Sequence, residues 1–219
     1  YGTKEMLEIF GEQKKVDYQL QIEAAAALSQ SEINLIPKSI AKDIARVARS
    51  GKITAKRIKQ LEAKSDHDTA ALVESLAERC KKESRPWIHY GLTSNDLVDT
   101  SNSMQMRDAI KIIQPKVGKL ALLLSKNAVK YKVLPAVGRT HGQHASIISF
   151  GLKFANWASE MATHLERLDE IKKRILICKT LGVVGTGSLM GKDAVRVQEL
   201  VAKKLSLFPA KVTTQIIPR

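Results

Sequence analysis

The sequence predicts an all-α protein, in which a small N-terminal helical domain is followed by the first part of a long-helix bundle. Apolar residues recur at three- and four-residue steps along most of the 219 residues, as in amphipathic α-helices. Two of the predicted helices contain roughly thirty residues or more and would each span about 50 Å. No convincing alternation of apolar and polar residues indicates a β-strand, and the best candidate, residues 211–217, is short.

The N-terminal domain is predicted to cover residues 1–91. Its first helix places Met6, Ile9 and a run of alanines where a core-facing helix needs them. Three shorter helices follow, and short polar segments separate them. The four predicted helices cover residues 4–28, 38–49, 54–63 and 68–82.

The second predicted domain, residues 92–219, begins the long-helix bundle. Its first helix covers residues 94–131, with Pro115 as the one notable breaker, and its second covers residues 145–179. Seven-residue spacing along the second helix is typical of a coiled coil or an elongated bundle, so we interpret the apolar stripe as core rather than as a cofactor site. The residues at this spacing are Phe154, Met161, Leu168 and Ile175.

The charge balance indicates an anionic partner. Thirty-six Lys and Arg residues against twenty-two Asp and Glu residues give a formal net charge of +14. A nucleic-acid binder and an enzyme with a small anionic substrate both fit such a charge. The basic residues are interleaved with acidic ones along the predicted helices, which is typical of solvated helix faces and disfavours nucleic acid as the partner.

Other classes of protein are disfavoured by the cysteines and by hydropathy. Cys80 and Cys178 lie far apart, without the spacing of a disulfide framework or a zinc site, so we expect a cytoplasmic protein without a metal. The longest strongly apolar stretch, residues 120–124, is far shorter than the ~20 residues that cross a bilayer. The first ten residues carry too many charges for a signal peptide.

The first candidate site is the segment Thr93–Asp96, at the predicted start of a long helix. Ser94 is a good N-cap there, and Asp96 lies in the first turn. Free backbone N–H groups, the positive end of the helix dipole and two hydroxyls suit a carboxylate or a phosphate. Helix capping alone also explains these residues, although His89 nearby favours a site.

The second candidate is the segment Gly138–Ala145, which reads GRTHGQHA and is expected to be a loop before the second long helix. Two histidines and an arginine make a poor core segment but a good site. A histidine titrates near neutral pH and can hand a proton to a leaving nitrogen. His141 and His144 lack a Glu or Cys at a metal-ligand spacing, so catalytic and structural roles stay open while a metal site is disfavoured.

The third candidate is Ser65–Asp68, another predicted helix start. Ser65 or Asp66 as the cap explains the hydroxyl and the carboxylate but not His67, although a lone histidine is more often structural than functional. Four of the five histidines fall in or beside these three segments. The glycine-rich segment 182–191 fails as a nucleotide-binding loop, because its spacing and its predicted helical context are wrong, and is expected to be a turn.

Five segments carry a family resemblance. They occur in the same order and with similar spacing as in the adenylosuccinate lyase family of the fumarase and aspartase superfamily, and the chain resembles that family over nearly its whole length. THGQHA and HYGLTSND are more similar to this family than to its sister enzymes. The resemblance implies a fumarase/aspartase-like fold and no cofactor. The segments read KSDHDTAALVESLAER, WIHYGLTSNDLVDT, GRTHGQHA, GVVGTGS and TTQIIPR.

The resemblance also implies a C–N lyase of the amidine-lyase type, acting in purine biosynthesis. Such an enzyme eliminates fumarate from adenylosuccinate to give AMP, and from the succinyl-carboxamide intermediate (SAICAR to AICAR). His141 matches the general acid for the departing nitrogen, and His67 matches the histidine that assists at the phosphate side of the substrate. The residues that match substrate contacts are Tyr1, Asp68, His89, Thr93, Ser94, Thr140 and Gln215.

The chain departs from the family pattern at one point, and the resemblance also implies an assembly. The family's serine base lies on a mobile loop that does not occur before Arg219, so the 219-residue chain alone is expected to be inactive. Family members are homotetramers in which three chains share each active site around an anionic purine nucleotide. The alternatives are another fumarate-releasing lyase, such as argininosuccinate lyase, and a basic helical scaffold that binds RNA or another polyanion without catalysis.

Overall fold

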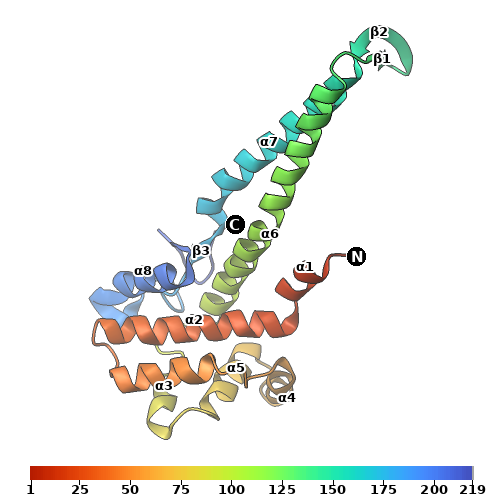
Figure 1. The fold of residues 1–219 in the computed structure, drawn as a ribbon. Coiled ribbons are helices and arrows are strands. Elements are labelled where there is room, and N and C mark those ends of the chain that lie inside the picture. Colours follow the sequence, from red (N-terminus) through yellow and green to blue (C-terminus); the bar gives the residue numbers. More distant parts are fainter. Residues whose placement is uncertain (219) are drawn as a thin grey trace. The chain divides into compact units, whose positions relative to one another are not determined.

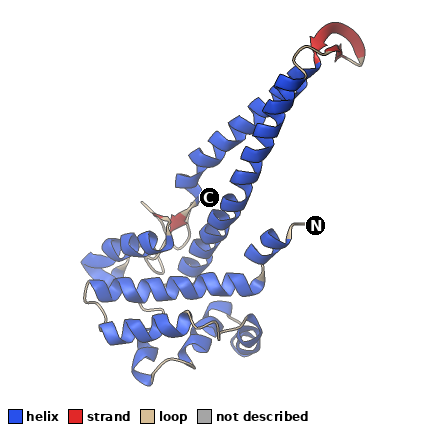
Figure 2. Ribbon diagram, in the orientation of Figure 1, coloured by secondary structure: helices blue, strands red, loops and turns tan. Residues whose placement is uncertain are grey.

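A computed structural model describes residues 1–218 and confirms the all-α fold class, with helices forming most of the chain (Figure 2). The chain divides into two compact units, which are described separately. The first unit contains residues 1–108 and the residues from 173 onward, and the second contains residues 109–172. The predicted domain boundary at residue 91 stays a prediction.

The helices of the first unit lie close to the predicted ranges. The predicted helix 4–28 is divided at Phe10–Gly11 into two helices, and the predicted helix 68–82 ends earlier, at Ala77. The elements wholly in this unit are α1 (Lys4–Ile9), α2 (Glu12–Glu32), α3 (Lys38–Ala48), α4 (Ala55–Ser65), α5 (Asp68–Ala77), η1 (Lys82–Trp87), β3 (Ile177–Cys178), η2 (Ser188–Asp193), α8 (Ala194–Leu205) and β4 (Phe208–Pro209).

Helix α2 is the centre of the first unit. Figure 1 shows α3 and α8 on opposite sides of it. The alanine run Ala24–Ala27 is buried, because a helix with neighbours on several sides needs small apolar residues on more than one face. The hydroxyl of buried Tyr18 donates a hydrogen bond of 2.8 Å to Asp108, which ties α2 to the first part of α6 (Ser94–Lys130).

A buried ion pair joins two distant segments of the first unit. Asp96 in the first turn of α6 and Lys179 just after β3 form a hydrogen-bonded pair, and both side chains are 0% exposed. Lys179 Nζ also donates to the carbonyl of Gly182 at 3.2 Å. Asp96 Oδ2 accepts from the backbone N–H groups of Gly182, at 2.9 Å, and Thr93, at 3.0 Å. Burial raises the pKa of Asp96, although these donors oppose the shift.

The segment after α8 corrects one expectation. Residues 211–217 do not form a strand; instead Phe208–Pro209, just before them, pairs in parallel with Ile177–Cys178. Buried Gln198 on α8 accepts from the backbone N–H of Thr180 and donates to the carbonyl of Ala210, which fixes both sides of this short ribbon. Tertiary hydrogen bonds, rather than side-chain alternation, therefore decide where the strand lies.

The second unit corrects another expectation, because the segment predicted as a loop is a β-hairpin. Strands β1 (Pro135–Thr140) and β2 (Gln143–Ser149) pair antiparallel, and α7 (Phe150–Ile175) begins five residues later than the predicted start at residue 145. The hairpin is drawn in red in Figure 2. Gly138 lies at an irregularity in the register, where a Cβ atom would come within 3.1 Å of the Ser146 carbonyl.

The two long helices meet at the base of this hairpin. Tyr131 near the end of α6 stacks on Phe154, with ring centroids 5.8 Å apart, and Phe150 and Trp157 complete an aromatic cluster. Gly151 lies against the backbone of α6: a Cβ atom there would be 2.4 Å from the carbonyl oxygen of Ala128. Phe154, Met161 and Leu168 of the predicted heptad stripe are half-buried within this unit.

A side chain at Gly151 should disrupt the close packing of α7 against the backbone of α6. We expect Gly151→Ala to lower the free energy of unfolding by about 1–3 kcal/mol, since the new methyl group would overlap backbone atoms that cannot move aside easily. The control is Gly118→Ala on α6, which has no atom within 4 Å of its added Cβ and should raise stability by up to about 1 kcal/mol. Urea denaturation compares the two variants; equal effects would contradict the close approach.

Removing one partner of the buried ion pair should be costly. Lys179→Met leaves a buried carboxylate without its counter-charge and is expected to destabilise the fold by about 3–5 kcal/mol. Lys204→Met breaks an ion pair with Glu32 whose partners are partly exposed, and should cost less than about 1 kcal/mol. The double variant Asp96→Asn/Lys179→Met should cost less than the sum of its single changes. The denaturant midpoints of the two single lysine variants are compared. Equal midpoints for Lys179→Met and Lys204→Met would argue against a stabilising role for the buried pair.

Candidate functional site

The start of α6 is built by a turn that depends on glycine. Gly91 has φ +73°, and a Cβ atom there would lie 2.9 Å from Met190 Cγ, so the turn leaves no room for a side chain. The helix begins at Ser94. The N-cap position before it is therefore occupied by Thr93, and not by Ser94 as predicted. Asp96 reaches back to the Thr93 N–H, as in a capping box. The hydroxyls of Thr93 and Ser94 therefore stand beside the positive end of a long helix.

His67 lies next to Ser94. It is the N-cap of α5, where its Nδ1 accepts a hydrogen bond of 3.2 Å from the Ala70 N–H, so the expectation that Ser65 or Asp66 caps this helix is wrong. Asp66 instead ends α4 in a left-handed conformation. Because Nδ1 accepts, the ring proton lies on Nε2, which is 3.4 Å from Ser94 Oγ. A ring N–H and a hydroxyl thus meet at the start of α6.

His89 is held by a carboxylate that the sequence analysis missed. Its Nδ1 lies 2.6 Å from Oε1 of Glu23 on α2, and its backbone N–H donates to Oε2 of the same residue at 3.1 Å. Burial by itself lowers the pKa of His89, but the hydrogen bond and charge of Glu23, with the charge of Asp96, outweigh burial and raise it. In the sequence, the one signal for this contact is Glu23 itself, a charged residue near the start of the apolar run from Ile22 to Ala27.

Three other predicted contacts are exposed, and one of them, Asp68, lies beside His67, with its Oδ1 3.8 Å from His67 Nδ1. Tyr1 and Gln215 are exposed, and the structure gives neither a hydrogen bond within residues 1–218. Asp68 is also exposed, and its Oδ1 accepts from the N–H of the next residue, Thr69, at 2.6 Å. Within the part of the chain that is described, no hydrogen bond joins these three residues to Ser94.

Thr140 and His141 belong to the second unit, where they form the tip of the hairpin. Thr140 pairs with Gln143, so His141 and Gly142 are the two central residues of the turn. Both have positive φ, +51° and +72°, as a type I′ turn requires. The His141 side chain is exposed there. A non-glycine residue in this conformation is uncommon and marks a position at which function is worth testing.

The glycine-rich segment 182–191 packs against the turn before α6. A Cβ atom on Gly182 would lie 3.1 Å from the Gly91 carbonyl, and one on Gly185 would lie 2.4 Å from the Thr213 carbonyl. Both glycines have positive φ. The segment therefore packs closely between the turn before α6 and the stretch that leads to Gln215, a role that only tertiary contacts reveal.

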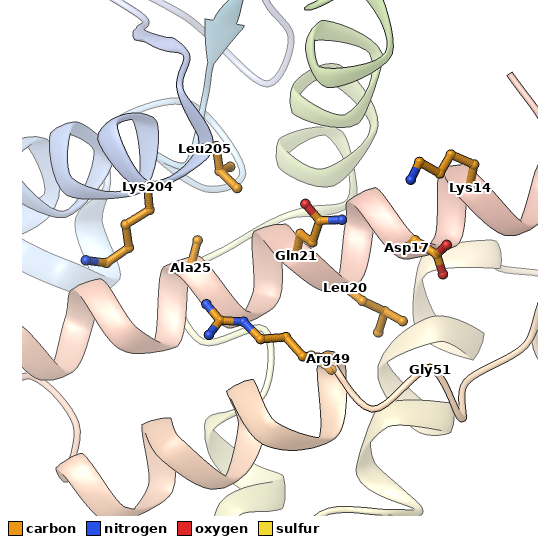
Figure 3. A pocket seen from close by; sticks show the side chains of 10 residues that line it. Lys14, Asp17, Leu20, Gln21, Ala25, Arg49, Gly51, Lys204 and Leu205 are labelled. Atoms are coloured by element: carbon orange, nitrogen blue, oxygen red, sulfur yellow. The ribbon is translucent and has the colours of Figure 1, made fainter. Parts of the chain in front are cut away.

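Other places in the first unit offer less chemistry. A pocket of about 480 Å³ between α2, the end of α3 and α8 carries Lys14, Arg49 and Lys204 at its rim, but none of the predicted site residues lines it (Figure 3). Burial raises the pKa of the Cys80 thiol to about 11 and that of Cys178 to about 12, so neither is a ready nucleophile. Residues 1–218 contain no cluster of metal-ligating side chains, and none of their helices is long and apolar enough to cross a membrane.

Comparison with known proteins gives close relatives. Adenylosuccinate lyase of Methanocaldococcus jannaschii is 42% identical over the whole chain, and that of Methanothermobacter thermautotrophicus is 38% identical. The chain covers 47% and 49% of these proteins, so it spans about half the length of the curated relatives it matches. The resemblance of the sequence motifs to the N-terminal part of this family is thereby confirmed.

Solved structures agree on the fold. Fumarate lyase from Mesorhizobium sp. BNC1 superposes with a TM-score of 0.90 at 29% identity, over 97% of this chain and 51% of that one. The β-carboxy-cis,cis-muconate cycloisomerase of Acinetobacter calcoaceticus sp. ADP1 gives 0.90 at 30% identity, over 96% and 50%. These similarities confirm the fumarase/aspartase-like fold. The family model described as lyase matches residues 2–218, and the chain therefore belongs to the lyase family.

Proposed function

We propose that the protein is an adenylosuccinate lyase, which eliminates fumarate from adenylosuccinate to give AMP and cleaves the succinyl-carboxamide intermediate of purine biosynthesis in the same way. The observation that carries the proposal is the 34–42% identity to adenylosuccinate lyases over the whole length of the chain. The activity belongs to the full-length protein, of which this chain supplies part of each active site.

The start of α6 is suited to the succinyl carboxylate. Removal of a proton from the succinyl carbon leaves a carbanion whose charge is shared with the neighbouring carboxylate. The hydroxyls of Thr93 and Ser94, together with the positive end of the helix dipole, stabilise this charge as it builds up. Because Asp96 and Lys179 fix the helix start, these donors need little reorganisation during the reaction.

The histidines take different parts in the proposed reaction. His141 protonates the nitrogen as the C–N bond breaks, and its exposed place at a tight turn leaves the ring free to meet a substrate. His67, which donates through Nε2, assists at the phosphate side. Tyr1, Asp68, His89, Thr140 and Gln215 provide further substrate contacts in this proposal. No cofactor or metal takes part.

The proposed assembly is a cytoplasmic homotetramer in which three chains share each active site. Large apolar side chains are exposed on the second unit, among them Leu122, Val129 and Ile147 at 65%, 67% and 80%. Such a set of exposed apolar residues is typical of an interaction surface rather than of a solvated helix pair. A shared site also explains why the residues of one protomer need not converge by themselves.

A second candidate is another fumarate-releasing lyase, such as argininosuccinate lyase, because the solved relatives include a protein described only as a fumarate lyase. Offering adenylosuccinate, the succinyl-carboxamide intermediate and argininosuccinate separately to the full-length protein, and measuring fumarate, distinguishes them. We expect turnover of the two purine substrates alone. Turnover of argininosuccinate alone, or salt-sensitive RNA binding without any fumarate, would contradict the proposal.

His141→Ala in the full-length protein is expected to lower kcat by about 10²–10⁴, the usual contribution of a general acid. The measurement is fumarate release from adenylosuccinate at saturating substrate. His164→Ala is the matched control, because His164 is on the partly exposed face of α7 near Glu160 and is assigned no role. Turnover of His141→Ala within a few-fold of that of the control would remove His141 from the mechanism.

A further inference from the structure

Glu23 makes an unusual pair of contacts for a residue in the middle of a core helix. Its side chain is 2% exposed, yet it is a carboxylate, and such groups are rarely buried without a partner. One oxygen lies 2.6 Å from Nδ1 of His89 and the other accepts the backbone N–H of His89 at 3.1 Å. Among the described residues, both recorded partners of this carboxylate belong to His89.

The backbone of His89 needs this support. Its φ is +61°, a left-handed conformation that costs a residue with a Cβ atom roughly 1–2 kcal/mol. The hydrogen bond from its N–H to Glu23 holds the conformation, and the chain then turns through Gly91 into the start of α6. Glu23 therefore fixes the path of the backbone four residues before Thr93 as well as the ring of His89.

We propose that Glu23 is a positioning residue: it holds His89 with a proton on Nδ1 and keeps the ring cationic, so that His89 meets an anionic group of the substrate through Nε2–H. This proposal rests on the proposed function, in which His89 contacts the substrate. The His89 side chain is 20% exposed, and its Nε2 has no hydrogen-bond partner within residues 1–218. One ring nitrogen is thus committed to Glu23, and the other is left for a ligand.

The surrounding charges favour the cation. The charged groups that act on His89 are Glu23 from α2 and Asp96 from α6, both anionic, and together they raise the pKa of His89 against the effect of burial. Asp96 is already paired with Lys179, which leaves Glu23 as the direct partner. In the proposed function, an imidazolium at residue 89 adds a positive charge to a site that is to receive a substrate with several negative charges.

The first test measures the pair without any substrate. Ring ¹⁵N shifts of His89 in the full-length protein should show Nδ1 protonated, with a pKa above the ordinary value of about 6.5. Glu23→Gln, which keeps the shape but removes the charge, should lower that pKa. Glu32→Gln is the control, since it removes a carboxylate from the partly exposed end of the same helix. Unchanged His89 shifts and pKa in Glu23→Gln would overturn the proposal whatever the enzyme catalyses.

The second test asks whether the pair serves the substrate. Glu23→Gln should raise KM for adenylosuccinate about tenfold or more while changing kcat less, as expected when a charge-assisted contact to bound substrate is weakened. Glu32→Gln should leave both constants near normal. Should the pKa of His89 fall without a change in KM, the positioning role fails although the pair is real. Absence of fumarate release by the wild-type protein would instead refute the proposed function, with the first test unaffected.

Stability gives a readout if Glu23→Gln binds substrate too weakly to measure. A histidine whose pKa is raised in the folded state adds stability that is fully present below its unfolded pKa, near 6.5, and is lost as the pH rises through the folded pKa. The difference in Tm between wild type and Glu23→Gln should therefore be larger at about pH 5.5 than at about pH 9. Glu23→Asp, which keeps the charge on a shorter stem, should restore part of this pH dependence. A Tm difference independent of pH would contradict a charged pair.

Discussion

The buried pair of Asp96 and Lys179 is the interaction on which the candidate site depends. Two charges without solvent exposure are costly in a protein interior unless hydrogen bonds satisfy their remaining donors and acceptors. Here the carboxylate accepts from Thr93 and Gly182 in addition to the lysine, and the lysine also reaches a carbonyl. A hydrophobic pair would fill the same space, but it would not specify where the α6 start and the 177–182 segment lie relative to one another.

The same logic extends to the other buried polar groups of the first unit. Glu23, far from Asp96 in sequence, points its carboxylate at the turn that leads into α6, and Thr100 on α6 exchanges hydrogen bonds with the backbone of Lys179. These contacts lie along the first two turns of one helix and the segments beside it. Polar groups are also buried on α2, among them Gln19, Glu23 and Gln30, whereas the buried residues of α8 are alanine, valine and leucine apart from Gln198.

Sequence periodicity was sufficient for the helices because their signal is local. Ser94 and its neighbours predict a helix start, and the seven-residue stripe predicts α7, from residues only a few positions apart. The hairpin escaped prediction because most of residues 135–149 are exposed, so burial imposes no alternation on Val137 or Ile147. The contact between Glu23 and His89 joins residues 66 positions apart, and no local pattern encodes such a pair. Family resemblance predicted the roles of His67, His89 and His141, whereas only the structure shows which residues surround them.

Two of the predicted site histidines share a strained backbone conformation, although they lie in different segments of the sequence. Within residues 1–218, His89 and His141 are among five non-glycine residues with positive φ. Each could be replaced by a glycine without strain, and each is followed by a glycine within two positions that shares the turn. In the proposed reaction, both rings contact the substrate. The left-handed conformation turns the chain sharply at the residue itself, which leaves the His141 ring exposed and the His89 side chain 20% exposed.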